Sequence, residues 1–205
     1  MRLHYLFDPL CGWCYGAARL VEALATAPGP ALPVELWPGA LFPDPVRIAP
    51  GMRAHIVQAD RQIARLTGAN FGAAYLARIG DPAREVTLWS VPLIAALAAG
   101  PRERQRELLA ALQHAHYVLG RDLADGEVLA EIAAAHGVDA ALLASAAHAQ
   151  ATGAWIRSAR QLMARAGIGG FPGFVLERDG RLQVLDHQAA YRDPQILVEY
   201  IASIK

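Results

Sequence analysis

The feature that most constrains the fold of this chain is the tetrapeptide Cys11-Gly12-Trp13-Cys14, which joins a strand pattern to a helix pattern. Residues 3–7 alternate as in a half-buried β-strand, and a helical pattern follows over residues 15–26. The chain contains no other cysteine. A Cys-x-x-Cys pair at a strand-to-helix junction, close to a βαβ pattern, is typical of a site that exchanges thiols and disulfides.

The first turn of a helix favours a thiolate, because unpaired backbone N–H groups and the helix dipole bring partial positive charge to that end. Residues at i and i+3 are about 5–6 Å apart, within the range that a disulfide bridges. Cys14 falls on the apolar stripe of the helix pattern and Cys11 on the other side; the stripe comprises Leu10, Ala17, Val21 and Leu24. We therefore predict that Cys11 is the exposed attacking thiolate and Cys14 the shielded resolving thiol.

A zinc site is the first alternative use of such a cysteine pair. Structural zinc needs four ligands, and the chain has no second cysteine pair. His114 and His116 lie two residues apart in a helix pattern, so their rings diverge. We therefore expect no metal and no organic cofactor. We favour a redox pair over a purely structural one because of its position at the helix start.

Charge and hydropathy argue against several other classes of function. The 205 residues carry 19 basic and 19 acidic side chains without a basic run, which argues against a nucleic-acid or membrane partner. The most apolar stretch, residues 88–99, is too short to span a bilayer and contains Pro92. Met1 and Arg2 lead straight into the first strand pattern without a signal peptide, so we expect a cytoplasmic protein. Cysteine pairs in that compartment are usually catalytic or redox-sensing.

Two segments of the chain have the pattern of α/β structure. In the first, the breaker Ala27-Pro28-Gly29-Pro30 ends the helix pattern, and a strand pattern at residues 33–37 completes a β-α-β unit with parallel strands. In the second, Asp179-Gly180 separates two strand patterns and predicts a tight β-hairpin, and Asp193-Pro194 begins a last helix. Between them, residues 51–153 are predicted to be helical throughout.

The order β-α-β, helical block, helix, β-β-α resembles a thioredoxin fold interrupted by an all-helical insertion, as in the DsbA-like family of thiol-disulfide oxidoreductases. Residues 8–16 (Asp-Pro-Leu-Cys-Gly-Trp-Cys-Tyr-Gly) are similar to the active-site opening of the predicted protein-disulfide isomerase branch of that family. Residues 117–125 are similar to a pattern late in the insertion. Residues 169–172 (Gly-Gly-Phe-Pro) are similar to the family's cis-proline loop.

The resemblance implies an α/β fold made of two domains. We expect a thioredoxin-like domain formed by residues 1–42 and 155–205, with a helical insertion domain over residues 43–154. This division places one helix over residues 139–149 and a separate helix from Trp155 onwards, on either side of the second boundary.

The resemblance also implies which residues bind substrate. The Phe171-Pro172 peptide bond is expected to be cis and to hold the Phe171 backbone opposite the cysteines, where it can hydrogen-bond an extended peptide. Gly12 and Trp13 complete this set. An apolar rim for an unfolded peptide is expected from Leu10, Trp13, Tyr15, Phe42 and Phe171.

One residue departs from the thioredoxin-fold pattern. Many such oxidoreductases bury an acid six residues before the first cysteine, where it exchanges protons with the inner thiol, but this chain has Tyr5 there. Asp8 or His4 is a candidate replacement acting through water. The alternative is that Asp8 caps the first helix and that His4 is an ordinary strand residue.

Three functions are compatible with these residues. The first is a thiol-disulfide oxidoreductase or isomerase that acts on protein or peptide disulfides through Cys11 and Cys14, with glutathione or another low-molecular-weight thiol as a further partner; the direction of electron flow is open. The second is a glutathione-dependent transferase or isomerase of the kappa-class type, whose members usually have Ser in place of the attacking cysteine. The third is a non-catalytic, redox-sensing module that binds peptides.

Overall fold

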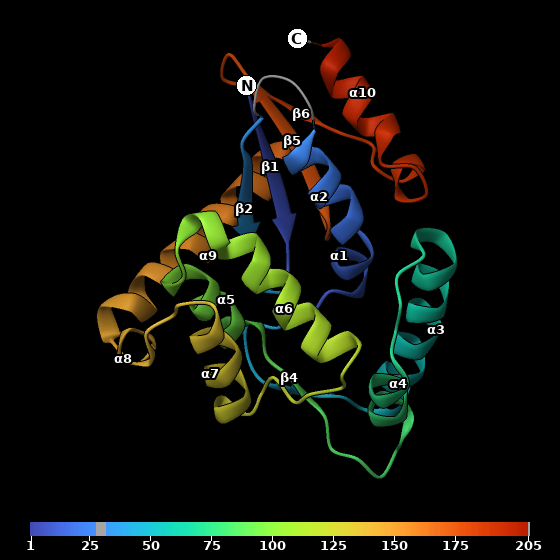
Figure 1. Cartoon of the computed structure of the whole chain (residues 1–205), viewed down its shortest axis with the longest axis vertical. Helices are drawn as coiled ribbons and strands as arrows, with labels where there is room; N and C mark the ends of the chain where they lie inside the picture. The colour runs from blue at the N-terminus through green and yellow to red at the C-terminus, as the bar shows by residue number, and fades with distance from the viewer. Residues whose placement is uncertain (28–31, 205) are drawn as a thin grey trace.

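A four-stranded sheet forms the centre of the molecule in this computed structural model, which describes residues 1–27 and 32–204 (Figure 1). The strand order is β2-β1-β5-β6. β1 is parallel to β2 and antiparallel to β5, and β6 pairs with β5 in a hairpin. The strands are β1 (Arg2–Phe7), β2 (Val34–Pro38), β5 (Gly173–Arg178) and β6 (Arg181–Val184). The predicted parallel pairing of the first two strands and the predicted hairpin are both confirmed.

Helices cover both faces of the sheet and one of its ends. In chain order they are α1 (Gly12–Gly16), α2 (Ala18–Thr26), α3 (Pro50–Thr67), α4 (Ala73–Gly80), α5 (Ser90–Ala99), α6 (Gln105–Tyr117), α7 (Gly126–Ala135), α8 (Ala140–Leu143), α9 (Ala146–Ala166) and α10 (Gln195–Ser203). α2 and α10 lie on one face and α9 on the other, while α3 to α7 lie beyond the end of the sheet at which β1 finishes (Figure 1).

Alternation along β1 separates two apolar cores. Leu3, Tyr5 and Phe7 point into the larger core, which α2 and α10 cover and which also contains Cys14. Leu6 points to the opposite face and packs on α9. Successive strand residues point to opposite faces, so position 5 faces the cysteines whereas position 4 faces away from them. The strand predicted at residues 3–7 is therefore confirmed, but it is buried on both faces and not on one as its alternation suggested.

The helix predicted over residues 15–26 is interrupted. α1 ends at Gly16 and α2 begins at Ala18, and the intervening Ala17 has φ −80° and ψ −4°. Glycine has a low helix propensity, and it stands at this junction. The two cysteines therefore belong to a short helix of their own and not to the long one.

The prediction that residues 51–153 are helical throughout is wrong at one place. Thr87–Leu88 forms β4, which pairs antiparallel with β3 (Val46–Arg47) in a separate two-stranded sheet. Strands of two residues are too short to show a period in the sequence. The helix predicted over residues 139–149 is broken into α8 and the start of α9, and the other predicted helices are present. Within the described ranges no helix has the length and apolar character to cross a lipid bilayer.

α9 is continuous where two separate helices were expected. It begins after Ser145, whose hydroxyl accepts a hydrogen bond from the His148 backbone N–H at 3.1 Å, and runs to Ala166. The expected domain boundary at residue 154 therefore lies inside this helix. Of the predicted breaker at residues 27–30, residues 28–30 lie outside the described ranges.

Candidate active site

Cys11 occupies the N-cap position of α1. Its backbone is extended, with φ −86° and ψ 115°, and its carbonyl oxygen accepts the first helical hydrogen bond from the Tyr15 N–H at 3.0 Å. The side chain is only 7% exposed, so the prediction that Cys11 is exposed is wrong. Cys11 is covered by the loop that contains Phe171 and by helices of the insertion. These segments are far from Cys11 in the sequence, so the local pattern could not show that they cover it.

Cys14 lies one turn further on and is fully buried in the larger core, as predicted. Burial raises the pKa of its thiol well above the ordinary value, and the neighbouring Cys11 sulfur raises it further. The Tyr5 hydroxyl donates a hydrogen bond to the Cys14 carbonyl oxygen at 3.2 Å. Both cysteines are free thiols. At neutral pH Cys14 is therefore a protonated thiol, so it cannot be the first nucleophile.

Asp8 holds the loop before the cysteines in place. One carboxylate oxygen accepts a hydrogen bond from the Leu10 N–H at 2.8 Å, and the other accepts one from the Leu41 N–H at 2.7 Å. The expectation that Asp8 caps the first helix is wrong, because no side chain caps α1. Burial raises the pKa of the Asp8 carboxyl, while these hydrogen bonds and one from Ser90 oppose the rise. Asp8 therefore ties the cysteine loop to the loop after β2.

His4 lies on the opposite face of the sheet from the cysteines. Its Nε2 is 2.9 Å from a carboxylate oxygen of Glu177, and its ring packs edge-on against Trp37. The hypothesis that His4 exchanges protons with the inner thiol is therefore wrong, because Tyr5 and Cys14 lie in the other core. In the described part of the chain, no group of three His, Cys, Asp or Glu side chains is arranged to hold a metal ion.

The loop before β5 faces Cys11. The Phe171–Pro172 peptide bond is cis, as predicted. The Cys11 Sγ lies 3.7 Å from the Phe171 carbonyl oxygen, as a weak hydrogen-bond donor. The Phe171 ring is held by the guanidinium group of Arg160, 5.3 Å from the ring centroid, and by the backbone of Gly39. A β-carbon on Gly39 would lie 2.2 Å from the ring, so only glycine leaves it this position.

Two cavities flank Trp13, whose ring stacks on Tyr191 with 5.9 Å between centroids. The larger of these two cavities, of about 670 Å³, is bounded by the cis-proline loop, α3 and the turn after β6. Its polar lining comes from Gln62, His187, Gln188 and Arg192, and its apolar lining from Trp13, Leu66, Phe171, Pro172 and Tyr191. The three predicted substrate-binding residues Trp13, Phe171 and Pro172 therefore share one cavity.

The second cavity, of about 250 Å³, lies between the cysteine loop and the insertion. Cys11 and Gly12 line it from the cysteine loop. Asp60 on α3 and His116 on α6 line it as well, although they are distant from the cysteines in the sequence. Burial raises the pKa of the Asp60 carboxyl to about 6. Burial, together with the charge of Arg78, lowers the pKa of His116 to about 3, so that ring is neutral.

The apolar rim predicted around the cysteines is only partly present. Leu10 is 8% exposed and belongs to the core. Tyr15 stacks on Tyr117 with 4.6 Å between centroids and donates a hydrogen bond to the Asn70 carbonyl oxygen at 2.7 Å. Leu10 and Tyr15 therefore do not form a rim for a peptide; Tyr15 instead joins the sheet domain to the insertion. Phe42 and Trp13 are half-buried and line the smaller cavity.

Several residues of the site were not expected from the sequence. Asp60 lies on α3, four residues after Ile56 and three residues before Ile63, and therefore on the same face of the helix. A carboxyl within this apolar stripe was the sequence signal that could have identified Asp60 as a site residue. Tyr191 and Arg192 lie in and directly after a short 3₁₀ turn that carries no comparable pattern. Their place in the site depends on how the chain returns after the hairpin.

The comparisons with known proteins agree with this geometry. The family model of the DSBA-like thioredoxin domain matches residues 2–191, so the chain belongs to the DSBA-like thioredoxin family. A solved structure of the cytosolic disulfide reductase DsbM from Pseudomonas aeruginosa is 38% identical, with a TM-score of 0.87 over 100% of both chains. A second structure of that protein, with glutathione (GSH), is 36% identical, with a TM-score of 0.80 over 99% of this chain and 98% of the other.

Two less similar structures show the fold alone. A proposed protein disulfide isomerase from Nitrosomonas europaea is 23% identical, with a TM-score of 0.78 over 98% of this chain and 97% of the other. A 2-hydroxychromene-2-carboxylate isomerase is 14% identical, with a TM-score of 0.62 over 100% of this chain and 96% of the other. A comparison with curated protein sequences gave no match.

Proposed function

We propose that this chain is a cytoplasmic thiol-disulfide reductase that acts on protein or peptide disulfides and is reduced in turn by glutathione. The observation that carries the proposal is the position of the Cys11 Sγ, at the N-cap of α1 and 3.7 Å from the Phe171 carbonyl oxygen. A nucleophilic sulfur and a backbone segment able to pair with a peptide thus lie side by side. In the described part of the chain, no group accepts a hydrogen bond from the Phe171 N–H, which leaves that donor for substrate.

The two cysteines act in sequence. The Cys11 thiolate attacks one sulfur of the substrate disulfide, so that bond breaks, a mixed disulfide forms at Cys11, and the other substrate sulfur leaves as a thiolate. Cys14 then attacks the Cys11 sulfur, its proton passes to the second substrate sulfur, which leaves as a thiol, and a Cys11–Cys14 disulfide remains. Two electrons have passed to the substrate. The burial of Cys14 supports this order, because its neutral thiol waits until the mixed disulfide forms.

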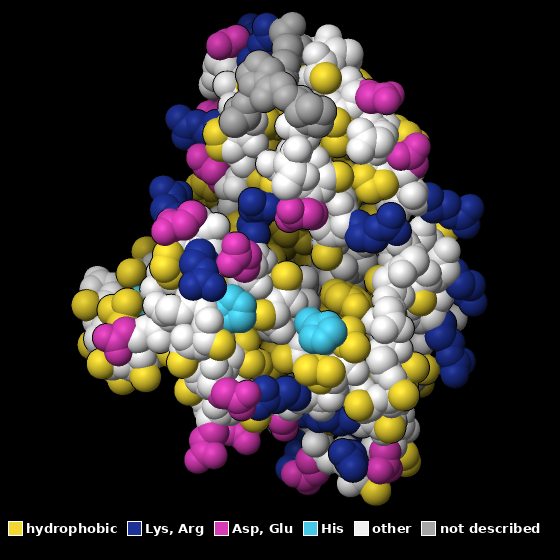
Figure 2. Space-filling model, in the orientation of Figure 1, with side chains coloured by type: hydrophobic (Ala, Val, Ile, Leu, Met, Phe, Trp, Pro, Cys, Tyr) yellow, Lys and Arg dark blue, Asp and Glu magenta, His cyan; other side chains and the backbone are white. Residues whose placement is uncertain are grey.

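Glutathione is proposed to bind in the larger cavity and to return the protein to its dithiol form. Two glutathione thiols together supply the two electrons and leave as glutathione disulfide. Arg192 offers a guanidinium group for a glutathione carboxylate, and Gln62 and Gln188 offer amides for its peptide groups. Basic side chains along the outer side of α3 (Figure 2) make the surroundings favourable for an anion. The structure of DsbM with GSH supports this choice of thiol.

The direction towards reduction and the cytoplasmic location are also proposals. They are supported by the 38% identity, over the whole chain, to a cytosolic disulfide reductase. The likeness to the hydroxychromene carboxylate isomerase is one of fold, and this chain keeps a cysteine at position 11. We therefore favour the reductase function over the glutathione transferase function and over the non-catalytic module.

The test is the reduction of insulin disulfides by glutathione, with turnover followed by recycling glutathione disulfide with glutathione reductase and NADPH. We expect catalytic turnover by the natural protein, none by Cys11→Ser, and a stable mixed disulfide on Cys11 in Cys14→Ser. One equivalent of insulin reduced without turnover would favour the redox-sensing module instead. Glutathione conjugation that survives Cys11→Ser would favour the transferase.

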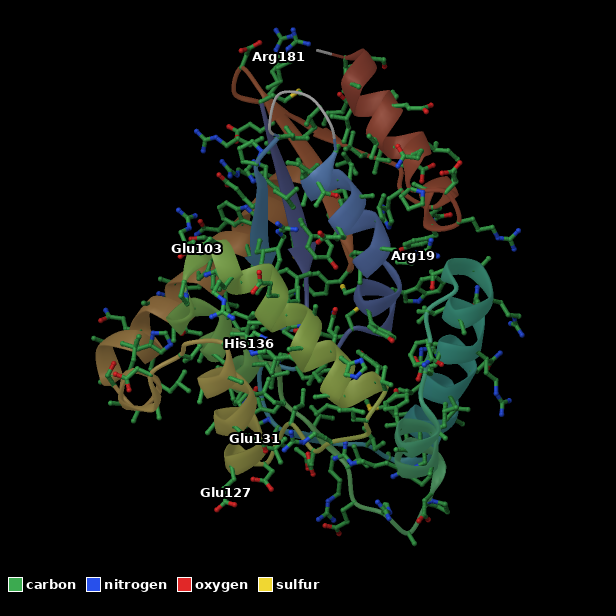
Figure 3. The ribbon with its side chains drawn as sticks, viewed as in Figure 1. Arg19, Glu103, Glu127, Glu131, His136 and Arg181 are labelled. Carbon is green, nitrogen blue, oxygen red and sulfur yellow. The ribbon has the colours of Figure 1, made fainter. Side chains whose placement is uncertain are left out.

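A matched pair of arginine variants tests the glutathione site. Arg192→Ala removes a charged hydrogen-bond donor from the larger cavity, and we expect the KM for glutathione to rise about tenfold or more. Arg181→Ala removes the same charge from the exposed tip of the β5–β6 hairpin (Figure 3), and we expect it to leave that KM unchanged. Equal effects of the two variants would show that the cavity does not hold glutathione.

A further inference from the structure

We propose that Asp60, which α3 of the insertion brings against the cysteine loop, is the carboxyl that takes the proton from Cys11 and returns it to the thiolate leaving the substrate. The inference rests on the proposed function, since it assigns one step within that reaction. It gives the insertion a chemical part in a site whose two sulfurs both come from the other domain. It also accounts for Tyr5, a residue that cannot serve as an acid-base group at the usual place.

The carboxyl of Asp60 lies against the residue that follows Cys11. A β-carbon on Gly12 would lie 2.9 Å from Asp60 Oδ1, so that oxygen packs directly on the backbone between the two cysteines. The same β-carbon would lie 3.1 Å from Ile63. A side chain at position 12 would therefore displace the Asp60 carboxyl or α3, and glycine is the residue that allows the carboxyl to come this close.

The two oxygens of this carboxyl have different surroundings. Oδ2 accepts a hydrogen bond from the Tyr75 hydroxyl at 2.7 Å, which fixes the orientation of the group. Oδ1 accepts no hydrogen bond from the described residues, and Asp60 lines the smaller cavity together with Cys11. That cavity, of about 250 Å³, has room for water molecules. A proton can therefore pass between Cys11 and Asp60 through water held in this cavity.

The groups that face Asp60 do not hold it as a permanent anion. Within the described ranges, no Lys or Arg side chain forms an ion pair with it. The titratable and charged groups around it are Cys11 at the start of α1, His55 on α3, Tyr75 and Arg78 on α4, and His116 and Tyr117 on α6. Arg78 is engaged with Asp122 at 2.8 Å, and His116 is neutral. Burial raises the pKa of Asp60 to about 6, so the group takes up and releases a proton near neutral pH.

Asp8, the other buried carboxyl near the cysteines, is less suited to this task. Both of its oxygens accept backbone N–H hydrogen bonds, from Leu10 and Leu41, so it has a structural role in the loop. Protonation of Asp8 would weaken the hydrogen bond that is accepted by the protonated oxygen. Asp60 can be protonated at Oδ1 and keep the hydrogen bond from Tyr75 to Oδ2.

The proton balance of the first half-reaction closes within the site. Asp60 as carboxylate takes the proton of the Cys11 thiol, and the resulting thiolate attacks the substrate disulfide. The sulfur–sulfur bond of the substrate breaks as the bond to Cys11 forms. The leaving thiolate then receives the proton from the Asp60 carboxyl, which returns to its starting form. No further acid, base or electron donor is needed for this step.

The test measures how fast the reduced Cys14→Ser protein forms a mixed disulfide with oxidised glutathione, from about pH 5 to pH 8. We expect the rate constant of this parent to rise with pH through a step near 6, as Asp60 loses its proton. With Asp60→Asn added, the step should disappear and the rate at neutral pH should fall about 100-fold. With Tyr75→Phe added instead, the carboxylate loses a donor, so the step should move to higher pH.

Glu127→Gln provides the matched control, since it removes one carboxylate from the exposed end of α7, away from α3 (Figure 3). We expect its rate and its pH profile to equal those of the parent. The proposal is overturned if Asp60→Asn keeps the step near 6, or if it slows the reaction equally at every pH. A parent that forms no mixed disulfide at all would overturn the proposed function and this step with it.

Discussion

The Tyr5 hydroxyl donates a hydrogen bond to the Cys14 carbonyl oxygen at 3.2 Å, from the position where many thioredoxin-fold oxidoreductases bury an acid. Burial raises the pKa of this phenol well above its ordinary value, and the nearby Cys14 and Cys11 raise it further. Tyr5 therefore stays neutral throughout the accessible pH range. It orients the backbone of α1 and does not exchange protons with either sulfur.

The first prediction follows from this role. Tyr5→Phe keeps the ring packing on Phe7 and Phe174 and removes one hydrogen bond. We expect the free energy of unfolding to fall by about 1 kcal/mol, while the pH profile of disulfide reduction stays as in the natural protein. Urea unfolding and the insulin assay measure the two effects. A changed pH profile would show that the phenol takes part in proton transfer.

The second prediction concerns the contact between Gly12 and α3. Gly12→Ala places a β-carbon 2.9 Å from Asp60 Oδ1 and 3.1 Å from Ile63, so the Asp60 carboxyl or α3 itself must shift. We expect a loss of about 1–3 kcal/mol in the free energy of unfolding and a slower first reaction step.

The control for this change is Gly51→Ala, in the first turn of α3, where an added β-carbon meets nothing within 4 Å. Alanine has the higher helix propensity, so we expect this variant to be as stable as the natural protein or slightly more so. Urea unfolding of both variants decides the matter. Equal stability of Gly12→Ala and the natural protein would contradict the close packing of α3 on the cysteine loop.

The local parts of the fold could be predicted from the sequence because their signals are local. The alternation of residues 3–7 follows from successive side chains pointing to opposite faces of the sheet. The Asp179-Gly180 hairpin is set by two residues with φ of 52° and 74°. The inward position of Cys14 follows from helical periodicity alone. Each of these features depends on neighbours within a few positions of the chain.

The exposure of Cys11 and the identity of the proton-exchanging group could not be predicted in this way. Cys11 is covered by Phe171 and by the insertion, and Asp60 reaches Gly12 only because α3 packs on α1. Tertiary contacts between segments tens of residues apart leave no period in the sequence. The one sign in the sequence that Asp60 has a special role was its position between Ile56 and Ile63. A buried carboxyl within an apolar stripe needs a hydrogen-bond partner or a charged partner.

The third prediction concerns the packing of the Phe171 ring against Gly39 and Arg160. In Gly39→Ala the new β-carbon would lie 2.2 Å from the ring, which must then leave its place beside Arg160 and shift the wall of the larger cavity. We expect the KM for glutathione to rise about tenfold. Gly126→Ala, at the start of α7 outside this cavity, where nothing lies within 4 Å of the added β-carbon, should keep the natural KM. An unchanged KM in Gly39→Ala would show that the ring position does not shape the glutathione site.

The fourth prediction concerns stability and pH. Burial raises the pKa of Asp60 from its ordinary 3.8 to about 6, so between these values the folded protein binds more protons at this site than the unfolded chain does. The contribution of Asp60 to stability therefore falls as pH rises from about 4 to about 6, by roughly 3 kcal/mol in total. Asp60→Asn cannot ionise and escapes this loss. We expect it to gain roughly 3 kcal/mol on the natural protein between about pH 4 and pH 7.

Urea unfolding of both proteins at several pH values checks this difference, and every other titrating group, including Asp8, is common to the two and cancels. Glu127→Gln, on the exposed end of α7, should show no gain of this size across the same range. If the advantage of Asp60→Asn stays constant or shrinks as pH rises, Asp60 is not a buried carboxyl that ionises at a cost. Its carboxylate would then be as well solvated in the folded protein as in the unfolded chain, and a group of that kind has no proton to give back to a leaving thiolate near neutral pH.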